Sequence, residues 1–131
     1  MIESSSLAEL ASIEEGSLFG GDASFDSVSI DTRTLDAGDL FVAIRGEAFD
    51  GHDYIAQAEK AGCCGVVSEE VLASEKPNLQ LQNTTHALGS IAGQNRSAFK
   101  GTVLGITGSS GKTTTKNMLA AILNLKASTC A

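Results

Sequence analysis

The sequence is poor in the residues that mark secreted and membrane proteins. Its 131 residues include no tryptophan, one proline and three cysteines. Cys63 and Cys64 are neighbours and Cys130 lies at the end, a spacing that fits neither a disulfide framework nor a set of metal ligands. No apolar run approaches the roughly 18 residues that a membrane-spanning helix needs, and Met1–Ser4 lacks the basic start of a secretory signal. We therefore expect a soluble cytoplasmic protein with reduced thiols and no membrane insertion.

Acidic residues are absent from the last 56 residues of the chain. All 16 Asp and Glu lie between Glu3 and Glu75, where three basic residues oppose them and leave a net charge of −13. The segment Lys76–Ala131 has six basic residues and no acid. Six charges without a cluster, with Phe99 as the one aromatic, argue against a nucleic-acid partner. A site that transfers or hydrolyses a nucleotide also needs carboxylates to hold Mg²⁺ or to orient a nucleophile, and this segment supplies none.

Composition and apolar patterning indicate a folded α/β protein. Hydrophobic residues make up 42% and charged residues 19%, which is enough for a core and too little charge for a disordered tail. Ser6 and Glu9 have the spacing of a capping box, which predicts a helix with Gly16 as its stop. The other elements predicted for the first part of the chain are a strand at 25–30, a buried strand at 40–44, a helix from Asp53 to a left-handed cap at Gly62, and strands at 65–67 and 79–81.

The charge change and the apolar pattern together place a domain boundary near Asn83. Thr84 can open a helix, and a strand at Thr102–Thr107 and a helix at Lys112–Leu123 follow, with a further strand at 126–130. This order of strand, loop and helix is that of the opening of a nucleotide-binding domain. We therefore predict one domain at residues 1–83 and the start of a second at residues 84–131.

The run Gly108–Thr113, between the predicted strand and helix, has the features of a phosphate-binding loop. Small residues let backbone N–H groups turn toward phosphate oxygens, the lysine ammonium reaches the β and γ oxygens, and the threonine hydroxyl can bind Mg²⁺. The general spacing would put a first glycine where Ile106 stands, so the match is to a variant, and the alternative is a glycine turn that only joins strand to helix. We predict Lys112 and Thr113 as catalytic residues, with Thr113 on Mg²⁺. The residues predicted to bind ATP are Gly108, Ser109, Ser110, Gly111, Lys112, Thr113 and Thr114.

Two separate sets of residues resemble the Mur ligases, the ATP-dependent enzymes that extend the peptide stem of bacterial cell-wall precursors. Gly105–Thr113 resembles the phosphate loop of that family. The motifs Asp31–Arg33, Gly38–Ala43, Gly46 and Phe49–Asp53 resemble the N-terminal domain of its later members, which holds the UDP end of a UDP-muramoyl-peptide. The resemblance implies an α/β fold in which a small N-terminal UDP-substrate-binding domain is followed by the first strand, phosphate loop and helix of a truncated ATPase domain.

The resemblance also implies a set of residues in contact with UDP. A diphosphate needs cations or N–H donors, and the acidic segment offers as cations only three basic residues and one histidine. The alternatives are that Asp31 and Arg33 pair across a turn and that residues 51–53 cap the next helix. The residues predicted to bind the UDP substrate are Thr32, Arg33, Arg45, Asp50, Gly51, His52 and Asp53.

Within the family, Ser109–Ser110 and Phe49–Tyr54 resemble the ligase that joins UDP-N-acetylmuramoyl-tripeptide to D-alanyl-D-alanine with ATP and Mg²⁺. In that reaction the tripeptide carboxylate attacks the γ-phosphate of ATP to give an acyl phosphate and ADP, and the amine of the dipeptide then displaces phosphate from the acyl carbon. The remaining magnesium ligands, a carbamylated lysine and a glutamate, are expected in a remainder of the chain beyond Ala131, so the fragment alone is expected to be inactive. Two alternatives stay open: the preceding ligase, which adds lysine or diaminopimelate to the UDP-dipeptide, and a stand-alone UDP-sugar-binding module.

Overall fold

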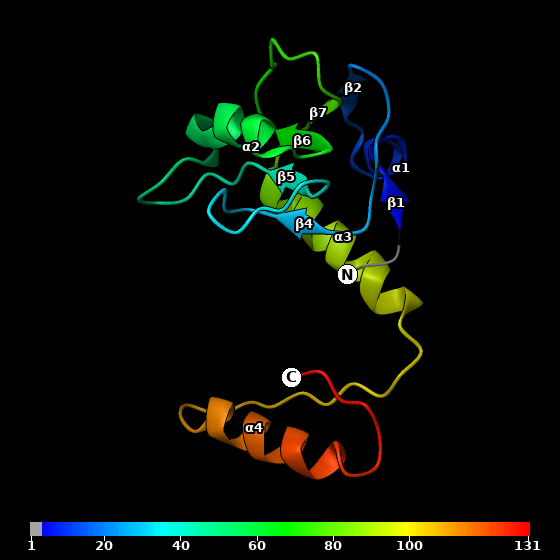
Figure 1. The fold of residues 1–131 in the computed structure, drawn as a ribbon, viewed down its shortest axis with the longest axis vertical. Coiled ribbons are helices and arrows are strands. Elements are labelled where there is room, and N and C mark those ends of the chain that lie inside the picture. The colour runs from blue at the N-terminus through cyan, green and yellow to red at the C-terminus, as the bar shows by residue number, and fades with distance from the viewer. Residues whose placement is uncertain (1–3) are drawn as a thin grey trace. The chain divides into compact units, whose positions relative to one another are not determined.

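The chain folds into two compact units. The structure is a computed structural model and describes residues 4–131. The first unit extends to Phe99, and the second runs from Lys100 to Ala131 (Figure 1). Each unit is described by itself below. No helix in the described part of the chain is long and apolar enough to cross a membrane.

The first unit contains nearly all of the regular secondary structure. The predicted strand at 25–30 divides into β3 and β4, which belong to different sheets. The elements in chain order are β1 (Ser5–Ser6), α1 (Leu7–Glu14), β2 (Ser17–Phe19), β3 (Ser24–Phe25), β4 (Val28–Ser29), β5 (Leu40–Val42), the 3₁₀ helix η1 (Gly51–Tyr54), α2 (Ile55–Ala61), β6 (Gly65–Ser68), β7 (Asn78–Gln80) and α3 (Thr84–Ala98).

A five-stranded sheet in the order β2-β7-β6-β5-β4 forms the centre of this unit. The strands β4, β5, β6 and β7 run parallel to one another, and β2 pairs antiparallel with β7 at the edge of the sheet. Every residue of β5 and β6 is buried, as expected for central parallel strands that are covered on both faces. The short strands β1 and β3 pair separately. The α/β class predicted from the sequence is confirmed.

Helices cover both faces of the sheet. On one face, Leu40 and Val42 of β5 belong to a core that includes residues of α1 and α3. On the other face, Phe41 packs in a second core with Ile55 and Ala58 of α2. Successive side chains of a strand point to opposite faces, so one apolar strand supplies both cores. Figure 1 shows the result, with α2 and α3 on opposite sides of the strands.

Local capping residues set the ends of the first two helices. The Ser6 hydroxyl accepts the N–H of Glu9 at 3.2 Å, which confirms the predicted start of α1. The helix ends at Glu14, and Glu15 rather than Gly16 takes the left-handed conformation, with φ of 53°. The predicted stop at Gly16 is therefore one residue too late. The left-handed cap predicted at Gly62 is confirmed, with φ of 95°.

Helix α3 belongs to the first unit, which moves the domain boundary. The sequence placed the boundary near Asn83, before this helix, whereas the compact units divide between Phe99 and Lys100. The reason is packing, because Ala87 and Ile91 of α3 are buried in the core beside α1. The change in charge that suggested a boundary near Asn83 reflects the end of the acidic residues at Glu75. It carries no information about which core a helix joins.

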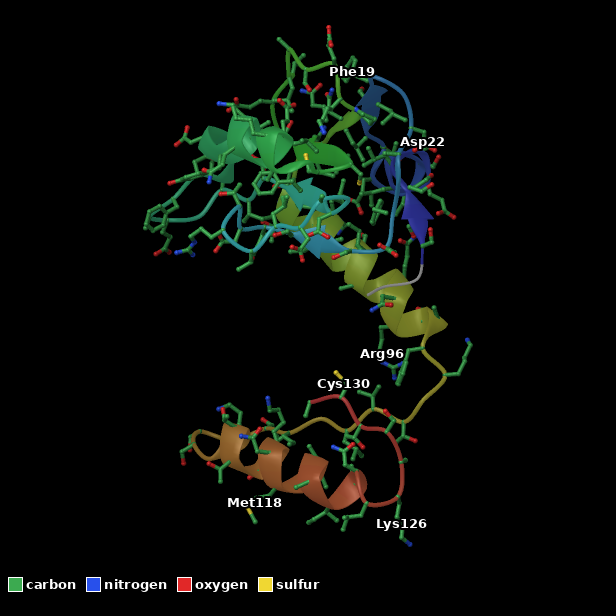
Figure 2. All side chains as sticks on the ribbon, viewed as in Figure 1. Phe19, Asp22, Arg96, Met118, Lys126 and Cys130 are labelled. Atoms are coloured by element: carbon green, nitrogen blue, oxygen red, sulfur yellow. The ribbon has the colours of Figure 1, made fainter. Side chains whose placement is uncertain are left out.

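The second unit contains a single helix, α4 (Lys112–Leu123), at the predicted place. The strands predicted at Thr102–Thr107 and 126–130 do not form, because a strand requires a neighbour and no segment among residues 100–131 pairs with either. None of the residues 100–131 is buried. Met118 and Lys126 extend away from the chain into solvent (Figure 2).

Candidate functional site

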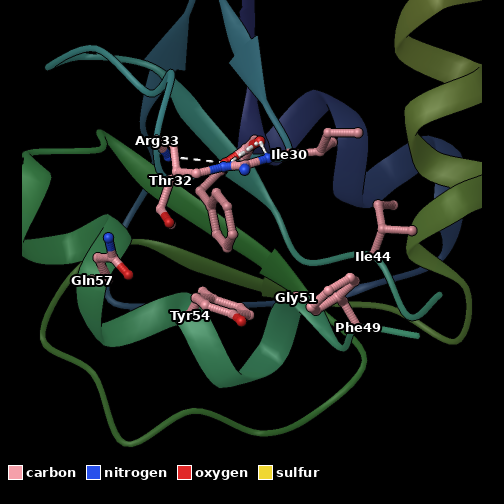
Figure 3. A pocket seen from close by; sticks show the side chains of 10 residues that line it. Ile30, Thr32, Arg33, Ile44, Phe49, Gly51, Tyr54 and Gln57 are labelled. Carbon is pink, nitrogen blue, oxygen red and sulfur yellow. Dashed lines mark hydrogen bonds and ion pairs between the residues drawn. The ribbon is translucent and has the colours of Figure 1, made fainter. Parts of the chain in front are cut away.

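A pocket of about 460 Å³ opens where the parallel strands β4 and β5 end. Open parallel sheets bind ligands at this edge, and the volume suits a small molecule. Part of the pocket comes from the loop after β4, part from β5 and the chain just beyond it, and part from the segment that leads through η1 into α2 (Figure 3). The lining residues are Ile30, Asp31, Thr32, Arg33, Phe41, Ile44, Phe49, Gly51, Tyr54 and Gln57.

Three of the apolar side chains that line the pocket are exposed to solvent. Phe49 is 74% exposed, Ile30 is 54% exposed and Tyr54 is 40% exposed. Large apolar groups grouped at a concavity are typical of a ligand site, and aromatic rings can stack on a planar ligand. The sequence did not identify Ile30 or Gln57 as site residues, and it favoured a core or helix-face role for Tyr54, because no local pattern reports that a ring will stay exposed.

Arg33 supplies positive charge at the edge of the pocket, and Asp31 holds it in place. The Nε and Nη2 atoms of Arg33 donate to the Asp31 carboxylate at 2.9 and 2.5 Å, and the Arg33 N–H donates to Asp31 Oδ1 at 3.0 Å. The side-chain hydrogen bonds from Arg33 lower the pKa of Asp31 to about 2. The Arg33 side chain is 84% exposed, and among the described residues Nη1 has no hydrogen-bond partner. Arg33 can therefore pair with Asp31 across the turn and still offer donors to a ligand.

Gly51 allows the η1 turn to start directly against the end of β5. Its N–H donates to the Ile44 carbonyl at 2.8 Å. A Cβ atom at this position would stand 2.7 Å from Ile44 N and 3.1 Å from Ala43 Cα, both backbone atoms. Because backbone cannot move aside cheaply, the close approach requires glycine. The motif Phe49–Asp53, which suggested a UDP contact, thus contains a residue needed to build the pocket wall.

Arg45 lies outside the pocket and is engaged by three carboxylates. It donates to Asp50 at 2.8 Å, to Glu69 at 3.3 Å and to Glu70 at 3.0 Å. The hydrogen bond from the Arg45 guanidinium holds the pKa of Asp50 well below its ordinary value, and the His52 N–H and ring contribute less to the same shift. This network closes the turn between Arg45 and Asp50, where Gly46 N–H donates to the Phe49 carbonyl at 2.9 Å.

His52 is buried behind the wall, with its side chain 5% exposed. Its Nδ1 lies 2.5 Å from Asp50 Oδ1, and its Nε2 accepts the N–H of Glu69 at 3.0 Å. Asp53 is exposed within η1. Of the seven residues predicted to bind UDP, the pocket therefore brings together Thr32, Arg33 and Gly51. The other four, Arg45, Asp50, His52 and Asp53, do not line it, because three form the supporting network and Asp53 faces solvent.

The predicted phosphate loop forms the start of α4 in the second unit. Gly111 precedes the helix with φ of 74°, and Lys112 begins it. The Lys112 ammonium donates to the Gly108 carbonyl at 2.5 Å. The lysine side chain therefore lies over the loop in which a phosphate group would bind. Thr113 and Thr114 are exposed on the first helical turn.

Magnesium would find one protein ligand in this unit. The Thr113 hydroxyl is accessible, but residues 100–131 contain no acid. Mg²⁺ commonly completes its shell with phosphate oxygens and water, so the residues fit one ligand position and no more. Elsewhere in the described chain, no three His, Cys, Asp or Glu side chains come together as a metal site.

Known proteins resemble the chain in both sequence and structure. The model of the "Mur ligase family, catalytic domain" matches residues 24–96. The UDP-N-acetylmuramoyl-tripeptide–D-alanyl-D-alanine ligase of Escherichia coli (strain K12) is 42% identical over 118 residues, which are 90% of this chain and 26% of that protein. The chain thus spans about a quarter of the length of the curated relatives that it matches.

Solved structures agree with this match. MurF from Acinetobacter baumannii covers 96% of this chain and 29% of its own, with 33% identity and a TM-score of 0.80. The MurF ligase from Thermotoga maritima in complex with ADP covers 76% of this chain and 23% of its own, with 36% identity and a TM-score of 0.66.

Proposed function

Because the chain belongs to the Mur ligase family, we propose that it provides the UDP-recognition unit and the ATP phosphate loop of a UDP-N-acetylmuramoyl-tripeptide–D-alanyl-D-alanine ligase. The named activity is that of the Escherichia coli relative. Residues 76–131, which include the predicted phosphate loop, contain no acid, so carboxylates that would share Mg²⁺ with Thr113 would have to come from outside this segment. The cytoplasm is the expected compartment, since the nucleotide substrates are found there.

The pocket at the end of β4 and β5 carries this proposal. Its exposed rings, Phe49 and Tyr54, can stack on the uracil, and Thr32 can hydrogen-bond the base or ribose. Arg33 stands at the edge with free donors for the diphosphate, in a geometry that Asp31 fixes. An apolar pocket with one convergent arginine suits a nucleoside diphosphate better than a peptide or a purely apolar ligand.

The second unit would act on the phosphates of ATP. Lys112 would leave the Gly108 carbonyl and bind the β and γ oxygens, where it stabilises the charge that develops as the tripeptide carboxylate attacks the γ-phosphorus. ADP leaves, and the amine of D-alanyl-D-alanine then attacks the carbonyl carbon of the acyl phosphate, which forms the amide bond and releases inorganic phosphate and a proton. Thr113 would hold Mg²⁺, which neutralises phosphate charge when bound. The Thermotoga maritima relative in complex with ADP supports nucleotide binding in this family.

A second candidate is a UDP-sugar-binding module without catalysis by the chain alone. The observation that favours it is the lack of any acid in residues 76–131. Under both candidates, the isolated chain should bind UDP and should not hydrolyse ATP.

A chimaera separates the two candidates. The chain would replace the matching segment of the Escherichia coli ligase, and addition of D-alanyl-D-alanine to the UDP-tripeptide would be followed by mass spectrometry. We expect turnover that Lys112→Ala abolishes, a loss of several kcal/mol of transition-state stabilisation, about 10³-fold or more. Lys116→Ala, one helical turn later on α4, is the matched control and should retain activity. A folded chimaera that binds UDP but has no activity would favour the binding module.

A further inference from the structure

The buried ring of His52 connects two elements behind the pocket wall. The wall segment Phe49–Tyr54 supplies three of the pocket residues, and His52 lies within it without lining the pocket. One ring nitrogen faces Asp50, which caps η1, and the other faces Glu69, directly after β6. Figure 3 shows Phe49, Gly51 and Tyr54 along the pocket side of this segment.

The hydrogen bonds fix which nitrogen carries the proton. A backbone N–H can only donate, so Nε2 of His52 must accept from Glu69. In the neutral ring the proton therefore sits on Nδ1, which donates to the Asp50 carboxylate at 2.5 Å. The ring presents neither a free donor nor a free cationic edge toward a ligand.

The two bonds of the ring have different importance. Asp50 is also held by Arg45 Nε at 2.8 Å and by the His52 backbone N–H at 3.0 Å, so the Nδ1 bond is one of three at that carboxylate. The Nε2 bond instead joins the η1 turn to the backbone at the end of β6, across 17 residues of sequence. Glu69 is itself anchored there, because its carboxylate accepts from Thr84 at 3.3 Å and from Arg45 at 3.3 Å.

We propose that His52 is a positioning residue, which fixes the wall of the UDP pocket to the end of β6 through its Nε2 atom and makes no contact with the diphosphate. This inference rests on the proposed UDP site. It differs from the direct phosphate contact that the sequence suggested, because a neutral acceptor at Nε2 is sufficient and no positive charge is required at this position.

Conservative variants separate the two bonds of the ring. His52→Gln keeps an acceptor that can reach the Glu69 N–H, whereas His52→Asn keeps a donor near Asp50 and loses the link to β6. His86→Gln is the matched control, since His86 is the other histidine of the chain and is exposed on α3 beside Glu14. The binding of UDP and of uridine to the full chain would be measured by calorimetric titration.

We expect His52→Asn to weaken both UDP and uridine by about tenfold, the effect of one lost buried hydrogen bond. His52→Gln should stay within about threefold of the wild type, and His86→Gln should match the wild type. A positioning role predicts equal losses for the two probes, because the whole wall moves. A loss confined to UDP in both variants would indicate direct contact with the diphosphate and overturn the proposal.

Nuclear magnetic resonance tests the same inference without a ligand. In the ¹⁵N-histidine-labelled wild-type chain, His52 should show the proton on Nδ1, and the Glu69 amide should be protected from hydrogen exchange in the wild type and His52→Gln but not in His52→Asn. A proton on Nε2 would overturn the positioning role even if UDP binds. If the wild type shows the Nδ1 proton and the protected amide but binds neither probe, the UDP site fails while the link to β6 stands. These readouts on the wild type hold even if the His52→Asn variant does not fold.

Discussion

The two units of the chain differ in what holds them together and in how their chemistry is encoded. The first unit, up to Phe99, has two apolar cores on either side of a parallel sheet and contains all the acidic residues. The second unit, residues 100–131, has one helix, no buried residue and no acid. Yet the predicted phosphate loop of the second unit is one contiguous run, whereas the pocket of the first is assembled from three segments. A segment can therefore carry a motif that is recognisable in the sequence without being packed into a core, and a packed site can lack such a motif.

Truncation of a core side chain should show the largest difference between the units. Leu40 is fully buried in the sheet, so Leu40→Ala should lower the free energy of unfolding by about 3 kcal/mol. Ile122 is 61% exposed on α4, and Ile122→Ala should change it by less than about 0.5 kcal/mol. Urea titration followed by far-ultraviolet circular dichroism measures both. Equal losses would show that α4 is packed as tightly as the sheet.

Replacing a glycine with alanine should also change the free energy of unfolding differently in the two units, by less than the truncation of Leu40. Gly51→Ala places a Cβ 2.7 Å from Ile44 N, so we expect a loss of about 2 kcal/mol and weaker UDP binding. At Gly105 an added Cβ would meet nothing within 4 Å, and Gly105→Ala should leave the unfolding free energy unchanged. A neutral Gly51→Ala would show that the pocket wall can shift away from β5 without cost.

Substitutions in the two units should also differ in their effect on the affinity for UDP. Arg33→Ala removes the cation at the pocket edge and should weaken UDP by about tenfold, or about 1.4 kcal/mol, with uridine unaffected. Lys112→Ala alters only the phosphate loop and should leave UDP affinity unchanged. Calorimetric titration of both variants checks this. If Lys112→Ala weakened UDP as much as Arg33→Ala, the diphosphate would be bound at the phosphate loop instead.

Apolar runs bounded by glycine allowed much of the first unit to be predicted. The strand predicted at 40–44 forms at Leu40–Val42, and the helix predicted from Asp53 to a cap at Gly62 forms at Ile55–Ala61 with that cap. The strand expected at Thr102–Thr107 shows the limit of that reasoning. An apolar run becomes a strand only beside a partner, and that partner is not a property of the run.

The site divides in the same way. Thr32, Arg33 and Gly51, which the sequence predicts as UDP contacts, do line one pocket, because a turn motif brings polar groups and a close backbone approach to one place. His52 was expected on the diphosphate because a histidine in an acidic segment is a rare cation. In the structure its Nε2 accepts the N–H of Glu69, and no local pattern connects these two residues. A long-range hydrogen bond of this kind decides whether a polar side chain contacts a ligand or supports the segment that does.

Lowering the pH should reduce the free energy of unfolding of the first unit as Glu14 is protonated, while the second unit has no acidic side chain to titrate. Glu14 ends α1 with its side chain 9% exposed, and its carboxylate accepts from Ser90 at 2.5 Å and lies 2.8 Å from His86 Nδ1, both on α3. The hydrogen bond from Ser90, followed by that from His86, lowers the pKa of Glu14 below its ordinary 4.5. The folded state therefore binds fewer protons than the unfolded state as the pH passes through this range.

The stabilisation from Glu14 is complete above about pH 4.5 and is lost as the pH falls through the lowered pKa of the folded state. Glu14→Gln should cost about 1 kcal/mol of unfolding free energy at pH 7, and the difference from the wild type should shrink on acidification. The exposed neighbour offers a matched control, since Glu15→Gln should change stability by less than about 0.3 kcal/mol. Urea titrations from pH 7 to pH 3 test this, and a difference that stayed constant with pH would mean that packing, and not the carboxylate charge, joins α1 to α3.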